Sequence, residues 1–169
     1  MAPISRAASP HVTIREFQPG DEAAFRTLNE EWILHHFGGM EAKDVESVSD
    51  PRRSILDREG RIFFAVRDGQ IIGCCALVAI GPGEYEVAKM AVTLAAQGAG
   101  IGRKLLQTVI AAAHASGATR LFLETNRVLT PAIRLYESCG FRHLPAERFV
   151  PSAYTRSNVQ MEMLLTQSE

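Results

Sequence analysis

The sequence predicts an α/β domain with a mixed, largely antiparallel twisted sheet of about six to seven strands. Two observations predict this class. Residues 61–67 (RIFFAVR) and 70–80 (QIIGCCALVAI) are apolar segments on either side of Asp68-Gly69, a pair that favours the tight turn of an antiparallel hairpin. Residues 84–125 then read as strand, amphipathic helix and strand, which requires a right-handed crossover between parallel strands.

Alternating apolar residues predict the strands, and apolar residues three or four apart predict the helices. Asp21 and Thr130 suit N-caps, Pro51 and Pro131 suit first helical positions, and Gly73 predicts a bulge. In chain order, the elements beside the hairpin are a strand at 12–17, a helix at 22–35, an acidic segment, helical or irregular, at 41–50, a short helix at 51–58, a strand at 84–92, a helix at 100–115, a strand at 120–125, a helix at 130–139, and two strands, one from 141 onward and one at 158–165.

Composition narrows the class of protein. Eighteen Lys and Arg residues against nineteen Asp and Glu residues leave a net charge of −1, which argues against a nucleic-acid binder. No segment approaches the roughly 20 apolar residues that span a bilayer. Residues 1–10 have no secretory signal pattern and read as a flexible leader before a single domain at 11–169.

The cysteines indicate the compartment. Cys74 and Cys75 are adjacent within an apolar run, so they fit reduced core thiols in a cytoplasmic protein rather than a disulfide framework. No Cys/His cluster has zinc-ligand spacing, and we therefore expect no metal.

The segment at residues 97–104 (QGAGIGRK) is the most informative part of the chain. It lies between a strand and a helix, and its glycines let a ligand approach the backbone without meeting a Cβ atom. The first N–H groups of the helix have no partners within it, and with the helix dipole they form an anion site suited to a pyrophosphate. Arg103 and Lys104 add positive charge.

Three phosphate-loop patterns can be compared with this segment. The dinucleotide pattern G-x-G-x-x-G fails because Arg103 stands where a third glycine should follow Gly98 and Gly100. The Walker A pattern fails because the chain has no Gly-Lys-Ser/Thr sequence. Gln97, Gly100 and Gly102 fit Q-x-x-G-x-G, a pattern that alone is equally typical of a structural turn at a helix N-terminus.

The segments around this loop resemble the GNAT superfamily of N-acetyltransferases. The resemblance is strongest over residues 84–141, the preceding helix and hairpin match in order, and Thr93 stands where many members have proline. It implies helices on both faces of the sheet and a central pair of parallel strands that splay apart. The matching segments are KMAV (89–92), QGAGIG (97–102), RKLL (103–106), LFLETN (121–126) and PAIRLYESCGF (131–141).

The resemblance implies acetyl-CoA as the acyl donor, bound where the parallel strands separate. A splayed strand leaves unpaired N–H and C=O groups, and the amides of the pantetheine arm can pair with them as an added strand does. The cofactor-binding residues carried over from the family are Met90, Ala91 and Val92 on the strand, Gln97, Gly98, Ala99, Gly100, Ile101, Gly102, Arg103 and Lys104 in the loop and helix start, and Asn126 after the next strand.

The implied reaction is direct acetyl transfer, in a ternary complex, to a primary amine of a small molecule or of a peptide or protein. Tyr136 stands at the family's tyrosine position, where a phenol acts as general acid toward the departing thiolate. Glu84 and Glu86 are candidates for the general base, directly or through a water. Spaced two apart, they share a strand face with Met90 and Val92 unless a bulge intervenes. A non-catalytic acyl-CoA-binding or sensing domain is the alternative.

The acceptor amine cannot be identified from the sequence. In the family, the region between the first two helices shapes the acceptor site, so His35, His36 or Trp32 could line it; ordinary helix-end and core roles are the simpler interpretation. An acidic stretch follows, which we interpret as a solvated face. Its members are Glu41, Asp44, Glu46 and Asp50. Family members are often dimers, so a homodimer is compatible with the sequence.

Overall fold

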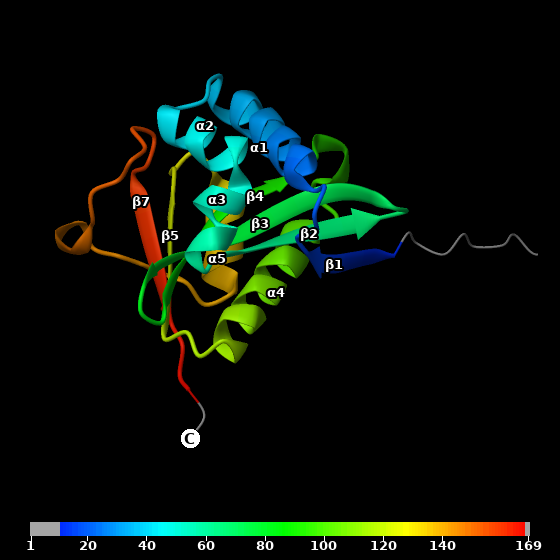
Figure 1. Ribbon diagram of the computed structural model, residues 1–169. Coiled ribbons are helices and arrows are strands. Elements are labelled where there is room, and N and C mark those ends of the chain that lie inside the picture. Colours follow the sequence, from blue (N-terminus) through cyan, green and yellow to red (C-terminus); the bar gives the residue numbers. More distant parts are fainter. Residues whose placement is uncertain (1–10, 168–169) are drawn as a thin grey trace, which may run out of the picture.

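A seven-stranded sheet in the order β1-β2-β3-β4-β5-β7-β6 organises residues 11–167, the part of the chain that the computed structural model describes (Figure 1). The leader expected at residues 1–10 lies outside the described residues. The strands are β1 (Val12–Glu16), β2 (Arg61–Arg67), β3 (Gln70–Gly81), β4 (Glu84–Val92), β5 (Arg120–Thr125), β6 (Arg142–His143) and β7 (Val159–Leu164). The α-helices are α1 (Glu22–Phe37), α2 (Ala42–Ser49), α3 (Pro51–Ser54), α4 (Ile101–Ala115) and α5 (Thr130–Ser138).

Strand pairing confirms the mixed, largely antiparallel sheet. All neighbouring strands pair antiparallel except β4 and β5, the two strands joined through α4, which pair parallel. The hairpin turn between β2 and β3 is also confirmed, because Asp68 and Gly69 have φ angles of 51° and 75°. Positive φ at both central residues matches the twist of the flanking strands.

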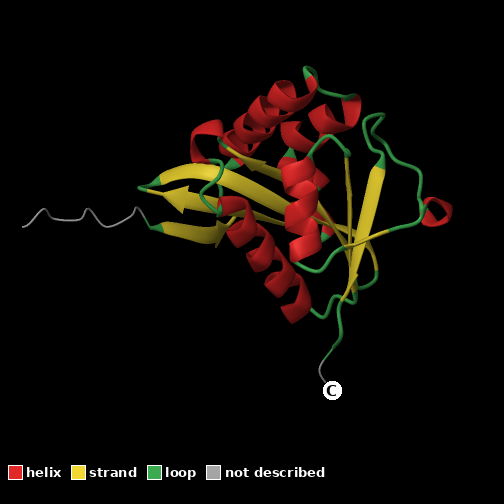
Figure 2. Ribbon diagram, turned by 180° about the vertical axis from the view of Figure 1, so that it is seen from behind, coloured by secondary structure: helices red, strands yellow, loops and turns green. Residues whose placement is uncertain are grey.

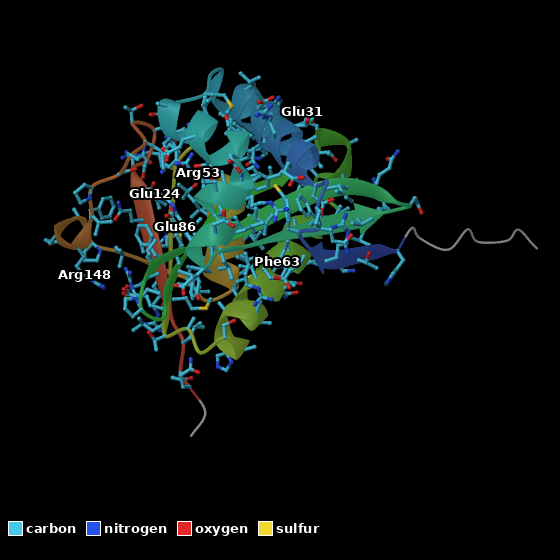
Figure 3. The ribbon with its side chains drawn as sticks, viewed as in Figure 1. Glu31, Arg53, Phe63, Glu86, Glu124 and Arg148 are labelled. Carbon is cyan, nitrogen blue, oxygen red and sulfur yellow. The ribbon has the colours of Figure 1, made fainter. Side chains whose placement is uncertain are left out.

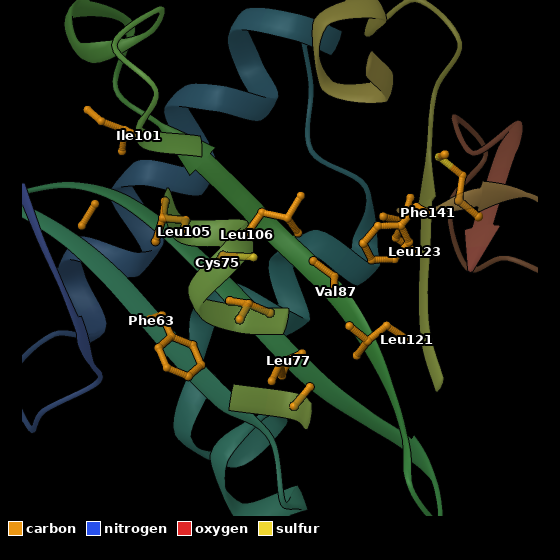
Figure 4. Close-up of a cluster of buried hydrophobic side chains, with 14 of the residues drawn as sticks. Phe63, Cys75, Leu77, Val87, Ile101, Leu105, Leu106, Leu121, Leu123 and Phe141 are labelled. Carbon is orange, nitrogen blue, oxygen red and sulfur yellow. The ribbon is translucent and has the colours of Figure 1, made fainter. Parts of the chain in front are cut away.

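Helices cover both faces of the sheet (Figure 2). Helix α4 packs on one face against a cluster that includes Phe63, Cys75 and Leu77 (Figure 4), and α1 packs on the other face against a cluster that includes Phe64 and Cys74. Neighbouring residues of β2 and β3 thus serve opposite cores, as the strand period of two requires. Among residues 11–167, no helix has both the length and the apolar character needed to cross a membrane.

The parallel pair separates soon after it forms. Only three residues of each strand pair, from Glu84 opposite Arg120 to Glu86 opposite Phe122. Beyond this point β4 runs on to Val92 while β5 diverges. The expected splayed central pair is therefore present, and it leaves the second half of β4 with a free edge toward β5.

A bulge in β4 changes which residues share a face. In the pairing of β3 with β4, Cys74 of β3 lies opposite Ala91 and Ala76 of β3 lies opposite Ala88. Three residue steps along β4 therefore match two along β3. Lys89, within the extra step, has a φ of 53°. Such a bulge shifts the side-chain alternation by one residue.

The expectation that Glu84 and Glu86 share a face with Met90 and Val92 is wrong for this reason. Met90 and Val92 pack against the α4 core, together with Val87. Glu86 instead lines cavities on the side of α1 and α2. The bulge thus directs the carboxylate of Glu86 and the side chains of the strand's end to opposite faces.

Three local predictions need adjustment. Asp21 lies at the N-cap position of α1 but does not cap it with its side chain, because its carboxylate accepts hydrogen bonds from Arg15 (2.6 and 3.0 Å) and from the N–H of Gln18 (2.7 Å). Thr130 is the first residue of α5 rather than its cap, which is Leu129. The strand expected from residue 141 onward is only two residues long and pairs with β7.

Candidate active site

A cavity of about 110 Å³ opens where β4 and β5 separate. Four of the catalytic and cofactor-binding residues expected from the sequence line it: Glu86 and Met90 from β4, Asn126 after β5, and Tyr136 from α5. Helix α1 and the loop between β6 and β7 supply other walls. The splay, rather than proximity in sequence, brings these side chains together.

Tyr136 reaches the cavity from α5. Its ring packs edge-on against Phe141, with 6.1 Å between the ring centroids. Burial raises the pKa of the phenol well above its ordinary value of 10.0, because the phenolate would be poorly solvated there. The hydroxyl therefore stays protonated at neutral pH and is available as a proton donor.

Glu86 enters the same cavity from the last paired position of β4. Burial raises the pKa of its carboxyl group to about 7, and the negative charge of Glu124 adds to this effect, while Lys89 and Lys43 oppose it. A carboxyl group with a pKa near the working pH is suited to accept a proton and release it again. One cavity is therefore lined by a carboxyl group suited to accept a proton and by a phenol suited to donate one.

Glu84, the other candidate base, lies elsewhere. It begins β4, at the paired end of the splayed strands, and its carboxylate is 3.5 Å from the guanidinium of Arg120. It is not among the residues that line the cavity. The structure thus brings Glu86, but not Glu84, to Tyr136.

The glycine loop lies beside α5. Gly98 and Gly100 have φ angles of 81° and 77°, and a Cβ atom at either would meet nothing within 4 Å, so the space above the loop is open. Helix α4 begins at Ile101 and has no side-chain cap. Gly102 contacts Leu135 of α5, because a Cβ at that position would lie 3.5 Å from the leucine side chain. The uncapped helix start and Tyr136 therefore belong to one region.

Polar side chains around the loop already have protein partners. Gln97 donates a hydrogen bond to the carbonyl of Val92 (3.2 Å), which holds the loop against the end of β4. Arg103 donates to Ser138 Oγ (3.0 Å), and Lys104 donates to a main-chain carbonyl of β1 (3.2 Å). Both basic side chains are exposed.

Asn126 has an organising role in this structure. Its Nδ2 donates to the carbonyl of Arg156 (2.7 Å), and its Oδ1 accepts from the N–H of Val128 (2.9 Å). The side-chain amide therefore ties the end of β5 to the loop before β7, next to the cavity.

Sequence reasoning missed a buried ionic cluster beside the cavity. The sequence predicts a solvated acidic face for Asp44, and this is wrong, because its side chain is 0% exposed. Its carboxylate accepts hydrogen bonds from Lys89 (2.8 Å) and, through two nitrogens, from Arg156 (2.6 and 2.7 Å). Lys89 also donates to the hydroxyl of Tyr154 (3.0 Å). The sequence shows only that the segment around Asp44 is acidic. The partners of Asp44, Lys89 and Arg156, lie 45 and 112 positions away in the chain.

This cluster fastens the loop between β6 and β7 over the cavity. Glu41 accepts hydrogen bonds from the backbone and hydroxyl of Thr155 (2.8 and 3.1 Å) and from Arg156 (3.2 Å). The guanidinium of Arg156 also lies 4.7 Å from the centre of the Tyr154 ring. Helix α2 therefore holds a wall of the cavity in place through charge-assisted contacts.

Replacing Asp44 by asparagine is expected to lower the free energy of unfolding by about 3–5 kcal/mol, because Lys89 would keep a buried charge without a counter-ion and Arg156 would keep only Glu41. Burial alone would raise the pKa of Asp44, but the hydrogen bonds from Arg156 and Lys89 outweigh it and hold the pKa well below 3.8. The contribution is thus complete above that pH and declines as the pH falls below it. Urea unfolding at pH 7 and pH 3 measures both effects.

A matched control is Asp57→Asn, since Asp57 is exposed and should leave stability within about 0.5 kcal/mol of wild type. Equal stability of the Asp44 and Asp57 variants at pH 7 would contradict a structural role for the cluster.

Among the aromatic candidates, Trp32 lines the cavity and also packs against the α1 core. His35 and His36 are exposed at the end of α1, with the His36 ring 4.5 Å from that of Trp32. The simpler helix-end interpretation suits the histidines, whereas Trp32 has both a core side and a cavity side.

A second cavity, of about 420 Å³, is also lined by Glu86 and Glu124. It opens between α2, β3 and the loop between β6 and β7, and it shares Glu86, Glu124, Lys89 and Tyr154 with the first cavity. Glu86 and Glu124 therefore stand at the junction of two cavities (Figure 3).

Comparison with known proteins gives consistent results. The model of the acetyltransferase (GNAT) family matches residues 22–141. An IAA acetyltransferase of Azospirillum brasilense is 31% identical over 133 residues, covering 78% of this chain and 85% of the relative. The crystal structure of a GNAT-family acetyltransferase from Staphylococcus aureus Mu50 superposes with a TM-score of 0.83 at 19% identity, over 92% of this chain and 100% of that one.

A third neighbour was solved with a ligand. It is N-acetylglutamate synthase from Neisseria gonorrhoeae, complexed with coenzyme A and N-acetylglutamate, with a TM-score of 0.68 and 22% identity over 95% of this chain but 36% of that chain. The family match spans the splayed strands, the glycine loop and the helix that carries Tyr136. The chain therefore belongs to the GNAT family of acetyltransferases and is an N-acetyltransferase, of a family whose general reaction is acetyl-CoA-dependent acetyl transfer.

Proposed function

We propose that this chain transfers the acetyl group of acetyl-CoA directly to a primary amine of a small molecule or of a peptide or protein, within a ternary complex. The observation that carries this proposal is the pairing of Glu86 and Tyr136 across one cavity at the splay of β4 and β5. One is a carboxyl group with a pKa of about 7, and the other is a phenol that stays protonated. Acyl transfer to an amine needs a base and an acid of this kind.

The residues present fit the acyl donor. The free edge of β4 at Met90, Ala91 and Val92 offers main-chain groups to the two amides of a pantetheine arm. The open space above Gly98 and Gly100, in front of the uncapped start of α4, suits a pyrophosphate. The neighbouring synthase that was solved with coenzyme A supports this assignment.

In the proposed reaction, Glu86 takes a proton from the acceptor nitrogen, directly or through a water. The nitrogen lone pair then attacks the thioester carbonyl, a C–N bond forms, and a main-chain N–H such as that of Val92 stabilises the oxyanion. When the C–S bond breaks, the leaving thiolate takes its proton from Tyr136, and the amide nitrogen gives up its second proton, which restores the phenol of Tyr136. The products are the amide and free coenzyme A.

Donor binding can be tested with two glycines at opposite ends of α4. Gly100 and Gly117 both have positive φ (77° and 80°) with open space around them. Gly100→Asp places a negative charge at the helix start, so we expect affinity for coenzyme A to fall at least about tenfold. Gly117→Asp carries a similar backbone cost at the far end and should leave affinity unchanged. Isothermal calorimetry measures both.

The absence of binding heat from wild type at millimolar coenzyme A would overturn the proposed donor site. A thiol-release assay with acetyl-CoA and a panel of amines tests turnover separately. Tight coenzyme A binding with no product from any amine would favour the alternative of a binding or sensing domain.

A further inference from the structure

Glu124 is a second carboxylate at the junction of the two cavities. It lies on β5 two residues beyond Phe122, the last residue paired with β4, so the separation of the strands exposes it to the gap. Glu86 pairs with Phe122 at the same point on the neighbouring strand. Both glutamates line both cavities.

Two hydroxyl groups hold the Glu124 carboxylate in place. Ser152 Oγ donates to Oε1 (3.0 Å) and Ser157 Oγ donates to Oε2 (3.1 Å). Both serines belong to the loop that Asp44 and Glu41 fasten through Arg156 and Thr155. The carboxylate is thus oriented by neutral donors, which leaves its negative charge uncompensated.

The nearby cations are already paired. Lys89 and Arg156 bind Asp44, and Arg156 also binds Glu41, so their positive charges are balanced. Arg120 pairs with Glu162 (2.8 Å) and Lys43 with Glu46 (3.2 Å). The ion pairs formed among residues 11–167 leave Glu86 and Glu124 without a cationic partner. The second cavity has one further basic residue, Arg58, and its side chain is exposed.

The environments of the two carboxyl groups differ. Glu86 faces Glu124 from β5, Lys89 from its own strand and Lys43 from α2, and burial raises its pKa to about 7. Glu124 has two hydroxyl donors that fix its orientation. Two carboxyl groups in unlike surroundings can take unlike roles, and here one has a pKa suited to proton exchange while the other is held in a fixed orientation.

We propose that Glu124 binds the acceptor as its ammonium ion beside Glu86, so that the acceptors of this chain are alkylamines that are protonated at neutral pH, rather than weakly basic amines such as arylamines. An alkylammonium has a pKa near 10, so it arrives charged. Glu124 attracts that charge, Glu86 takes one N–H proton, and the neutral amine is left for acetyl transfer. This inference rests on the proposed function for the step after binding, but not for the binding itself.

Binding is tested without acetyl transfer. In the presence of coenzyme A alone, n-butylammonium and n-butanol are matched in length and differ in charge, and an NMR titration gives the ratio of their affinities. We expect wild type to prefer the ammonium, and Glu124→Gln to reduce that preference by about tenfold, as expected for a hydrogen bond to a charged group. Glu31→Gln, at an exposed position of α1 away from the two carboxylates (Figure 3), is the matched control and should keep it.

The kinetic readout is the pH profile of kcat/KM with n-butylamine as acceptor. Because the negative charge of Glu124 raises the pKa of Glu86, Glu124→Gln should move the acidic limb to lower pH while raising the KM for the amine. A purely structural role for Glu124 would not move the limb in that direction. Glu124→Asp keeps the charge and should retain more of the preference for ammonium than Glu124→Gln does.

An unchanged affinity ratio in a folded Glu124→Gln variant, or no preference for butylammonium in wild type, would overturn this inference. Failure of all amines in the thiol-release assay would instead overturn the proposed function, because the affinity ratio is measured without acetyl donor.

Discussion

Replacing Tyr136 by phenylalanine is expected to lower kcat about 10²- to 10⁴-fold, the usual contribution of a positioned general acid, while affinity for coenzyme A stays unchanged. The hydroxyl is the only group removed, so the packing of the ring against Phe141 is retained. Without a proton donor, the thiolate must leave as a free anion or take a proton from water. Steady-state kinetics with saturating acetyl-CoA, together with calorimetry, separate the two effects.

The pH dependence adds a second check on Tyr136. Burial raises the pKa of this phenol above its ordinary value of 10.0, so the acid form persists throughout the neutral range. The wild-type enzyme should therefore show no alkaline loss of kcat from Tyr136 below about pH 10. Tyr85→Phe is the matched control, since Tyr85 lies on β4 and is not among the residues that line the cavity. A kcat near wild type in Tyr136→Phe would remove Tyr136 from the mechanism.

Much of the fold could be predicted from sequence because its signals are local. Asp68-Gly69 sets a turn, and residues 84–125 show strand, helix and strand by periodicity alone. The caps were less predictable, since Asp21 could bind either its own helix or Arg15, and the guanidinium prevails in the fold. A charge-assisted bidentate pair outweighs a single cap hydrogen bond.

The β4 bulge had no local signal. Residues 84–92 (EYEVAKMAV) alternate well enough for a regular strand, and the extra step appears only in the pairing with β3. The long-range contact of Lys89 with Asp44 holds the bulged residue on the α2 side. The residues of the candidate site differ in the same respect. Tyr136 and Glu86 lie within residues 84–141, where the family resemblance is strongest, whereas the surroundings of Asp44, Arg156 and Glu124 come from segments far away in the sequence.

Both candidate bases precede the bulge in β4, so the bulge does not distinguish one from the other. Their positions along the strand do: Glu86 lies where β4 and β5 part and lines both cavities, whereas Glu84 lies near Arg120 at the paired end of the strands. Burial raises the pKa of Glu86 to about 7, and this gives a substitution of Glu86 a pH signature that experiment can detect.

Glu86→Gln is expected to lower kcat/KM by about 10²- to 10⁴-fold and to remove the acidic limb of the pH profile. In wild type, activity should fall as the pH drops through about 7, because protonated Glu86 cannot accept the acceptor's proton. Glutamine has no such titration, so the residual activity should be flat across this range. Glu84→Gln should keep the wild-type limb, because Glu84 is paired with Arg120 away from the cavity.

Stability gives a readout of Glu86 that is independent of activity. A carboxyl group whose pKa rises on folding, here from 4.5 to about 7, favours the folded state below the lower value and loses that contribution as the pH rises through about 7. Above pH 7 the buried carboxylate therefore costs stability, and Glu86→Gln should raise the free energy of unfolding there by up to about 3 kcal/mol. Urea unfolding at pH 5 and pH 8 tests the sign. A variant that keeps the acidic limb and gains no stability at pH 8 would show that Glu86 is neither the base nor a strained charge.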